Sequence, residues 1–256
     1  VFRIIKQYIQ MKLFFTKTPK FVTWLFPKRI WAFSRSEKNV YLTFDDGPIP
    51  EVTPWVLEQL SAYNAKATFF CIGENIKKHP GILERLISEG HAFGNHTLNH
   101  LKGTETPAEK YIQNVDAFED VIQNLNIGKS NLFRPPYGRI TRKQAEMLQK
   151  RGYKIVMWDV LSYDWKREVS AEQCLQNVLK NIQLENNKNY HEKYCEVLIE
   201  NKLDNQEKYF GRTKYMTPVI FETNNCKIGE LANIKITSFN QKNLFGIYKT
   251  NKVKAA

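Results

Sequence analysis

Up to residue 183, two hydrophobic periods alternate along the chain. Short runs rich in β-branched and aromatic residues, typical of buried strands, are separated by longer segments in which apolar residues recur at helical spacing. The expected strands cover 40–44, 66–72, 91–95, 132–134 and 153–160. The expected helices cover 51–64, 75–89, 107–125, 141–152 and 170–182, with Thr141 and Ser170 as N-caps. This order predicts an α/β fold with a largely parallel sheet.

The remainder of the chain follows a different pattern. A polar, Asn-rich run at 183–193 is followed by five short strand-like runs at 194–200, 208–213, 218–221, 231–237 and 244–248. Short strands separated by turns in this way are typical of a small β-barrel. The predicted domains are a lead-in at 1–37, an α/β domain at 38–183, a polar junction at 184–193 and a β-barrel at 194–250.

Two adjacent carboxylates, Asp45 and Asp46, follow the first strand and precede a Gly47-Pro48 turn. Because successive side chains of a strand alternate across the pleat, the two acids point in different directions. One can therefore hold a metal ion while its neighbour faces a substrate. Asp-Asp-Gly is also an ordinary turn sequence, and without further signals the turn is the simpler interpretation.

Two histidines downstream favour the metal site. His96 and His100 are four residues apart, on one face if the segment is helical, at a spacing that suits one ion. One Asp and two His with positions left for water form the ligand set of a catalytic zinc site rather than a closed structural one. His79 and His91 lie outside this pattern, and we interpret both as ordinary helix-end or core residues.

Four motifs, TFDDGP, HTLNH, RPPYG and the pair Asp164-Trp165, occur in this order. Together they resemble the metal-dependent polysaccharide deacetylases (NodB-homology carbohydrate esterases), over about residues 38–183. The family includes peptidoglycan and chitooligosaccharide N-deacetylases. The resemblance implies a distorted, incomplete (β/α) barrel with its active site at the carboxyl ends of the strands. It also implies a hydrolase that removes N-acetyl groups from a cell-wall-type glycan, and the same site chemistry leaves another acyl or amide substrate open.

The resemblance assigns the metal and its neighbours. Asp46, His96 and His100 would bind one divalent ion, with zinc expected, and water would occupy an open position. Asp45 would be the general base and Arg134 would pair with it.

Further roles follow from the same resemblance. The backbone N–H of Tyr137 would stabilise the tetrahedral oxyanion, and Pro136, Tyr137 and Trp165 would contact the sugar. Where relatives often carry a first Asp in the last motif, this chain has Leu161. Asp159 lies two residues earlier, hence on the same strand face, and we expect it to orient the arginine instead.

The family's remaining motif, a Leu-x-His at the end of one more buried strand, has no counterpart. Its place is taken by the polar run at 183–193, which a barrel interior could not bury without unpaired groups. The downstream histidine is His191, with Asn189 where a leucine is wanted. The general acid is therefore missing or displaced, and we expect metal binding with weak or no turnover.

The C-terminal sequence EVLIE…FGRT…IGELANIKIT…LFGIY resembles the TRAM domain, the RNA-binding barrel of radical-SAM tRNA methylthiotransferases, over about 190–250. None of that family's cluster-binding cysteines accompanies it, so its chemistry is not implied. The alternative function is therefore a catalytically defective metal-binding domain with an RNA-binding tail. The join indicates a chimera, either a gene fusion or a product of rearranged DNA.

Charge favours anionic partners. The formal net charge is +12 and the pI is about 9.4, which suits cell-wall polymers, acidic membrane surfaces or nucleic acid. Residues 1–36 contain no acidic residue, which favours either a peripheral membrane arm or a lead-in packed on the fold. We expect no membrane span and no signal peptide, a natural start at Met11, and a cytoplasmic or membrane-surface location.

Overall fold

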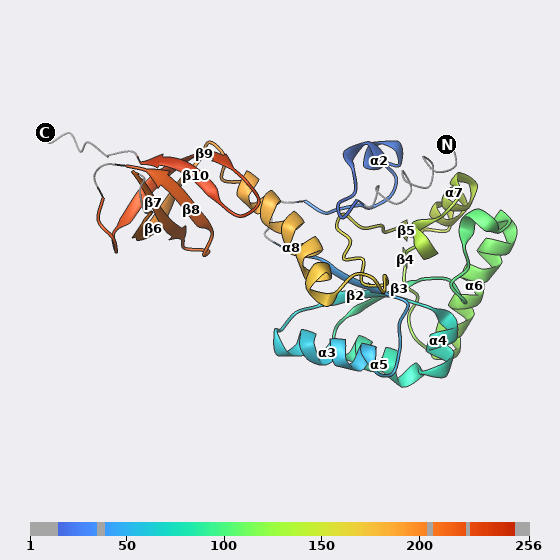
Figure 1. Cartoon of the computed structure of the whole chain (residues 1–256). Helices are drawn as coiled ribbons and strands as arrows, with labels where there is room; N and C mark the ends of the chain where they lie inside the picture. Colours follow the sequence, from blue (N-terminus) through green and yellow to red (C-terminus); the bar gives the residue numbers. More distant parts are fainter. Residues whose placement is uncertain (1–14, 35–38, 204–206, 224–225, 249–256) are drawn as a thin grey trace, which may run out of the picture. The chain divides into compact units, whose positions relative to one another are not determined.

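The computed structural model describes residues 15–34, 39–203, 207–223 and 226–248. Met11, where we predicted a start, lies outside these residues. The chain divides into two compact units, which are described separately (Figure 1). One unit covers residues 18–159, and the other combines 160–256 with the described residues ahead of 18. None of the helices described is both long and apolar enough to cross a bilayer.

The first unit is built on a parallel sheet whose strands follow one another in sequence order. They are β1 (Leu42–Asp45), β2 (Ala67–Cys71), β3 (Ala92–Asn95), β4 (Leu132–Phe133) and β5 (Lys154–Ile155). All five predicted strands are present, and their carboxyl ends meet at one edge. The fifth is shorter than predicted, because the chain after Ile155 pairs with Ile30 of the lead-in through a bridge to Val156.

The helices between the strands also follow the predicted order. They are α3 (Val52–Ala62), α4 (Gly73–Lys78), α5 (Pro80–Ser88), α6 (Ala108–Asn124) and α7 (Arg142–Lys150), preceded by α2 (Lys20–Leu25). Thr141 caps α7 as predicted, in a capping box with Gln144. The single helix predicted over 75–89 is wrong, because the chain breaks at His79. A proline at the next position disfavours the helical region there, and His79 adopts φ −136° and ψ 56°.

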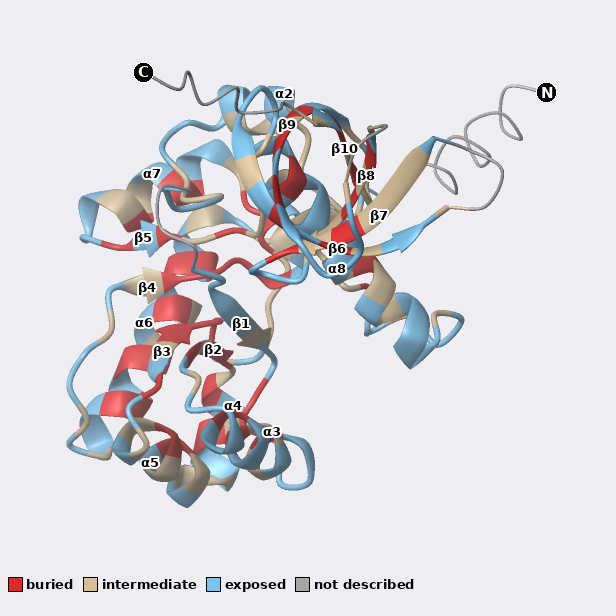
Figure 2. Cartoon of the chain, turned by 90° about the vertical axis from the view of Figure 1, so that its left-hand side faces the viewer, coloured by how far each residue is buried: buried red, intermediate tan, exposed pale blue. Residues whose placement is uncertain are grey.

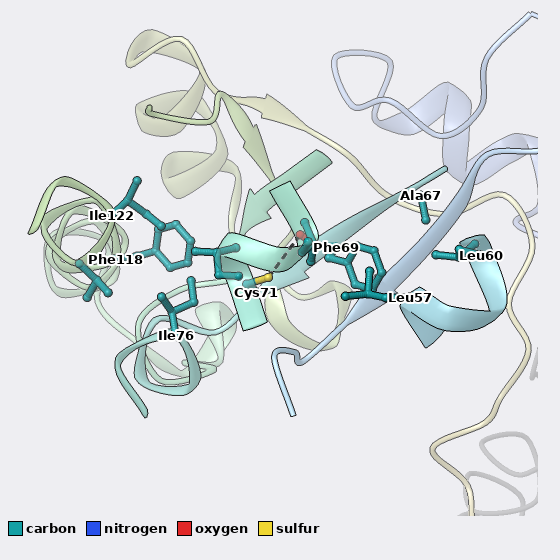
Figure 3. Packing of buried hydrophobic residues seen from close by; sticks show 11 residues of the cluster. Leu57, Leu60, Ala67, Phe69, Cys71, Ile76, Phe118 and Ile122 are labelled. Carbon is teal, nitrogen blue, oxygen red and sulfur yellow. Dashed lines mark hydrogen bonds between the residues drawn. The ribbon is translucent and has the colours of Figure 1, made fainter. Parts of the chain in front are cut away.

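Apolar residues of α3, α4 and α6 pack against β2. Figure 3 shows Phe69 and Cys71 of β2 between Leu57 of α3 and Phe118 of α6. The Cys71 thiol is fully buried, burial raises its pKa to about 12, and its Sγ hydrogen-bonds the carbonyl of Phe69 at 3.6 Å. Cys71 is therefore a small core residue and not a reactive thiol.

The first strand is less buried than predicted. Val40, Tyr41 and Leu42 are 57%, 54% and 39% exposed, and β1 is drawn largely in the exposed and intermediate colours in Figure 2. The reason is its position at the end of the sheet, since within the described residues β1 pairs only with β2. The prediction of a buried strand was therefore wrong here. The sequence could not show this, because a hydrophobic run has the same pattern in an edge strand and in a central one.

The second unit contains α8 (Ala171–Lys188) and a closed five-stranded barrel. The strands are β6 (Tyr194–Lys202), β7 (Lys208–Thr213), β8 (Pro218–Glu222), β9 (Leu231–Phe239) and β10 (Leu244–Tyr248), in the order β10-β8-β7-β6-β9. The predicted small all-β barrel is confirmed. Ser170 caps α8 as predicted. The helix continues past the predicted end at residue 182, because polar residues weaken apolar periodicity without stopping a helix.

His91, just before β3, makes the stability of the first unit dependent on pH. Its side chain is 1% exposed, and Nδ1 accepts a hydrogen bond from the N–H of Ala67 at 3.2 Å, so the ring is neutral. Burial and the charge of Lys66 lower its pKa, against an opposing effect of Glu89. The unfolded chain, with a His pKa of about 6.5, therefore takes up the proton first as the pH falls.

We expect the contribution of His91 to the free energy of unfolding to be fully present above about pH 6.5 and to be lost as the pH falls below it. Urea unfolding at pH 7.5 and 5.5 measures the loss. The matched control is His91→Gln, which keeps a neutral acceptor and cannot titrate. Equal losses in both proteins would show that His91 is not the responsible group.

Candidate metal centre

At the end of β1, Asp45 and Asp46 face different partners, because Asp46 lies past the last strand residue with a left-handed backbone instead of continuing the pleat. Asp45 accepts a hydrogen bond from Arg134 at 2.8 Å. Asp46, which leaves the strand with φ 67°, faces two imidazoles. The Asp-Asp-Gly segment therefore supplies one carboxylate to Arg134 and the other to a candidate metal site.

The segment between β3 and α6 brings the two histidines together as a turn rather than as the helix we considered. We call residues 96–100 the histidine turn. Thr97 and His100 have positive φ values of 67° and 59°, and the centroids of the His96 and His100 rings are 5.1 Å apart. The left-handed residues bend the chain back, so that both rings reach the end of β1.

Three potential ligand atoms meet at this point. Asp46 Oδ1 lies 3.4 Å from His96 Nε2 and 3.2 Å from His100 Nε2, and the ligand atoms of the three residues lie within 4.8 Å of one another. Ligands about 2.1 Å from a tetrahedral ion are about 3.4 Å apart, so the arrangement fits one small divalent cation. The hydrogen bond with His96 lowers the pKa of Asp46, and burial lowers the pKa of His100. Both shifts favour the protonation states in which these groups bind a metal.

Two backbone carbonyls fix the position of His96. Its Nδ1 lies 2.7 Å from the carbonyl oxygen of Arg134, and its backbone N–H donates to the carbonyl of Cys71 at 3.0 Å. A carbonyl beside Nδ1 favours the tautomer with its proton on that nitrogen, in which Nε2 would be the atom that binds an ion beside Asp46. The ring is 2% exposed, so this orientation is fixed by packing as well.

Arg134 is buried where β4 ends, and its guanidinium connects three elements. It donates to Asp45 and to Thr43 at 2.8 Å each, and to the carbonyls of Val156 and Met157 at 3.2 and 2.8 Å. Burial lowers its pKa, and Asp45 opposes the shift. Thr43 was not among the predicted site residues, although its place two residues before Asp45 puts both side chains on one face of β1.

Backbone strain is concentrated around this centre. Asp46, Thr97, His100 and Tyr137 all adopt positive φ, which costs about 1–3 kcal/mol each for residues other than glycine. The ring of Tyr137 is 60% exposed and its centroid lies 4.5 Å from that of His100. Pro136, the other substrate-contacting residue that we predicted in this motif, is buried. The RPPYG segment thus borders the histidines directly.

Three further residues of the sequence analysis have the following neighbours. The backbone carbonyl of Asp159 accepts a hydrogen bond from Thr18 at 2.7 Å, and its role in orienting Arg134 stays a prediction. Trp165 belongs to the second unit and is 59% exposed, with its ring 5.0 Å from that of Tyr163. Its contact with a sugar also stays a prediction. His191 precedes β6, and its Nε2 lies 3.0 Å from the carbonyl of Thr237.

Comparison with known proteins gives two matches along the chain. The family model for polysaccharide deacetylase matches residues 33–156, and the model for the TRAM domain matches residues 188–249. The first match contains the metal centre and Arg134, whereas Asp159, Trp165 and the place of the missing Leu-x-His lie beyond it.

Individual relatives cover the same part of the chain. A peptidoglycan-N-acetylglucosamine deacetylase of Bacillus cereus is 40% identical over 156 residues, which is 60% of this chain and 56% of the relative. A second one from the same organism is 35% identical over 59% of this chain and 71% of the relative. The crystal structure of the Bc1960 peptidoglycan N-acetylglucosamine deacetylase superposes with a TM-score of 0.59 at 36% identity, covering 64% of this chain and 76% of that one. The chain thus spans little more than half of the first relative. Its motifs, its parallel sheet and these matches place the chain in the polysaccharide deacetylase family, with a TRAM domain after the deacetylase part.

Proposed function

We propose that this protein removes N-acetyl groups from an N-acetylated glycan of the peptidoglycan or chitooligosaccharide class. The observation that carries the proposal is the convergence of Asp46, His96 and His100 on one point, with Asp45 held beside it by Arg134. The relatives named above act on N-acetylglucosamine residues of peptidoglycan according to their names, which supports the substrate class.

Asp46, His96 and His100 would hold one divalent ion, for which zinc is the best match to a set of one carboxylate and two imidazoles. When bound, such an ion supplies a Lewis acid that polarises the acetamide carbonyl and lowers the pKa of water.

The chain's own groups handle the proton and the developing charge. Asp45 is placed as the general base that accepts a proton from the attacking water, and Arg134 fixes its carboxylate in position. The N–H of Tyr137 would stabilise the oxyanion of the tetrahedral intermediate. Of the sugar contacts predicted in the RPPYG segment, the exposed Tyr137 would reach the sugar, whereas Pro136 is buried. Asp159 would orient the arginine.

Turnover is expected to be impaired, because the family's Leu-x-His is replaced by the polar run that forms the end of α8. His191 does not replace it, since its Nε2 is engaged by the carbonyl of Thr237 on β9. Protonation of the leaving amine is therefore left to water.

The deciding experiment is acetate release from an N-acetylglucosamine oligomer. We expect slow release that a chelator abolishes and zinc restores, and no release from Asp46→Asn. His79→Ala, which changes a histidine outside the centre, is the matched control and should keep the wild-type rate. Zinc-independent release, or none at any zinc concentration, would contradict the proposal.

A second function is favoured by the barrel, in which cationic side chains lie over aromatic rings. Lys214 is 5.0 Å from the ring of Tyr215, which is 56% exposed, and Arg212 is 5.5 Å from the ring of Phe210. Such pairs suit stacking of bases and binding of phosphates. RNA binding whose affinity falls steeply with salt would support a defective metal-binding domain with an RNA-binding tail. RNA affinity that does not change with salt would exclude it.

The lead-in carries an exposed aromatic patch that suits a membrane surface. On α2, Phe21, Trp24 and Leu25 are 59%, 78% and 56% exposed, in a segment that has basic residues and no acidic ones. We expect the protein to sediment with anionic phospholipid vesicles at low salt and Trp24→Ser to do so less. The control is Trp55→Ser, because Trp55 of α3 is also 59% exposed but lies outside the patch. Equal sedimentation of the two variants would exclude this contact.

A further inference from the structure

A buried polar cluster lies behind the metal centre and belongs to none of the predicted functional residues. Asn95, Glu119 and Tyr153 are 0%, 6% and 4% exposed. Glu119 Oε1 accepts a hydrogen bond from the Tyr153 hydroxyl at 2.5 Å and one from Asn95 Nδ2 at 3.1 Å. A carboxylate inside a core is costly, so its presence calls for a role beyond packing.

Asn95 links this cluster to the histidine turn. Its Oδ1 accepts the backbone N–H of Thr97 at 2.8 Å, and Thr97 is the left-handed residue that follows His96. The backbone carbonyl of Asn95 accepts a hydrogen bond from the N–H of Arg134 at 3.1 Å, and the carbonyl oxygen of Arg134 in turn contacts His96 Nδ1. One residue therefore contacts both features: its side chain supports the bend of the turn, and its backbone carbonyl holds the strand end that orients the first imidazole.

The amide of Asn95 is itself fixed by the cluster. Besides Glu119, its Nδ2 donates to the carbonyl of Val115 at 3.1 Å and lies 3.4 Å from the Tyr153 hydroxyl. Only Oδ1 is then free to face the turn, because the carboxylate and the carbonyl both require the NH₂ group. Asn114, also on α6, accepts the N–H of Leu98 at 3.0 Å and supports the same turn from its other side.

We propose that Asn95, Glu119 and Tyr153 are positioning residues that hold the histidine turn in its metal-binding shape before any ion arrives. The inference deepens the proposed function, since it rests on the same three ligands. The strained residues Thr97 and His100 relax toward ordinary backbone conformations when this support is removed, and the two Nε2 atoms then diverge.

The first test measures zinc affinity by competition with a chromophoric chelator. Loss of an outer-shell partner costs about 10–100-fold in metal affinity, and we expect a fall of this size for Asn95→Ala. Tyr153→Phe removes only a hydroxyl and should weaken binding less. The matched control is Val121→Ala, which removes buried volume from α6 two residues after Glu119 and should lower stability without changing zinc affinity. Zinc affinity equal to wild type in both test variants would overturn the inference.

The second test needs no metal. Amide exchange of Thr97 should be slow in the metal-free wild type and in Val121→Ala, and faster in Asn95→Ala and Tyr153→Phe. Unchanged exchange in the two test variants would overturn the inference even if Asn95→Ala folds poorly, because Tyr153→Phe still decides. A wild-type protein that binds zinc but releases no acetate would contradict the deacetylase proposal and leave this one standing.

Discussion

Replacing Arg134 by methionine is expected to lower the free energy of unfolding of the first unit by about 3–5 kcal/mol, because it removes one partner of a largely buried ion pair. The Arg134 side chain is 3% exposed and that of Asp45 is 32% exposed. The loss also leaves the carbonyls of Val156 and Met157 without their donor. Urea unfolding of the full chain, followed by tryptophan fluorescence, measures the change, since four of the five tryptophans lie in the first unit.

A double variant separates the charge from the lost packing. Asp45→Asn in the Arg134→Met background removes the unpaired carboxylate and should recover part of the stability. The matched control is Arg142→Met, whose side chain is 92% exposed and which should change stability little. If Arg134→Met and Arg142→Met unfold at the same urea concentration, the ion pair does not hold the strand ends together.

Much of this architecture could be predicted from local sequence patterns. The strands that carry the site follow from runs of β-branched and aromatic residues, and the capping of α7 by Thr141 follows from the Thr-x-x-Gln spacing. That Asp45 and Asp46 face different partners was expected from strand alternation, although Asp46 in fact leaves the strand with a left-handed backbone. The candidate ligands Asp46, His96 and His100 were predicted from the resemblance and from the spacing of the histidines, and the structure brings the three side chains together. These features depend on residues close together in the sequence, which is why a single sequence was enough to predict them.

The features that were missed depend on partners distant in sequence. Glu119 belongs to an amphipathic helix and has no local signal that distinguishes it from a solvated acid, yet its partners are 24 and 34 residues away. The exposure of β1 depends on what lies beside it in the sheet, which its own residues do not encode. The shape of the histidine turn depends on the left-handed Thr97, held by Asn95. Long-range hydrogen bonds therefore set the details of the site, and the local pattern sets its location.

The largest expected kinetic effect concerns the general acid, which we propose is missing from this chain. With zinc saturating, we expect kcat/KM for an N-acetylglucosamine oligomer to be about 10²–10⁴-fold below that of the 35% identical Bacillus cereus relative, because a positioned acid contributes a factor of this size. His191→Ala should leave the residual rate unchanged, since the imidazole is bound to the carbonyl of Thr237.

The pH profile identifies the cause of a low rate. A bell-shaped dependence of kcat/KM on pH reports an essential base and an essential acid of the free enzyme. With Asp45 as base and no acid in the chain, the rate should rise with pH to a plateau and show no descending limb due to an enzymic acid. A low rate with a full bell would mean that the acid is present and that misfolding or poor substrate binding limits the reaction. A bell at the relative's own rate would mean that another side chain protonates the leaving amine, and the impaired-enzyme proposal would be wrong.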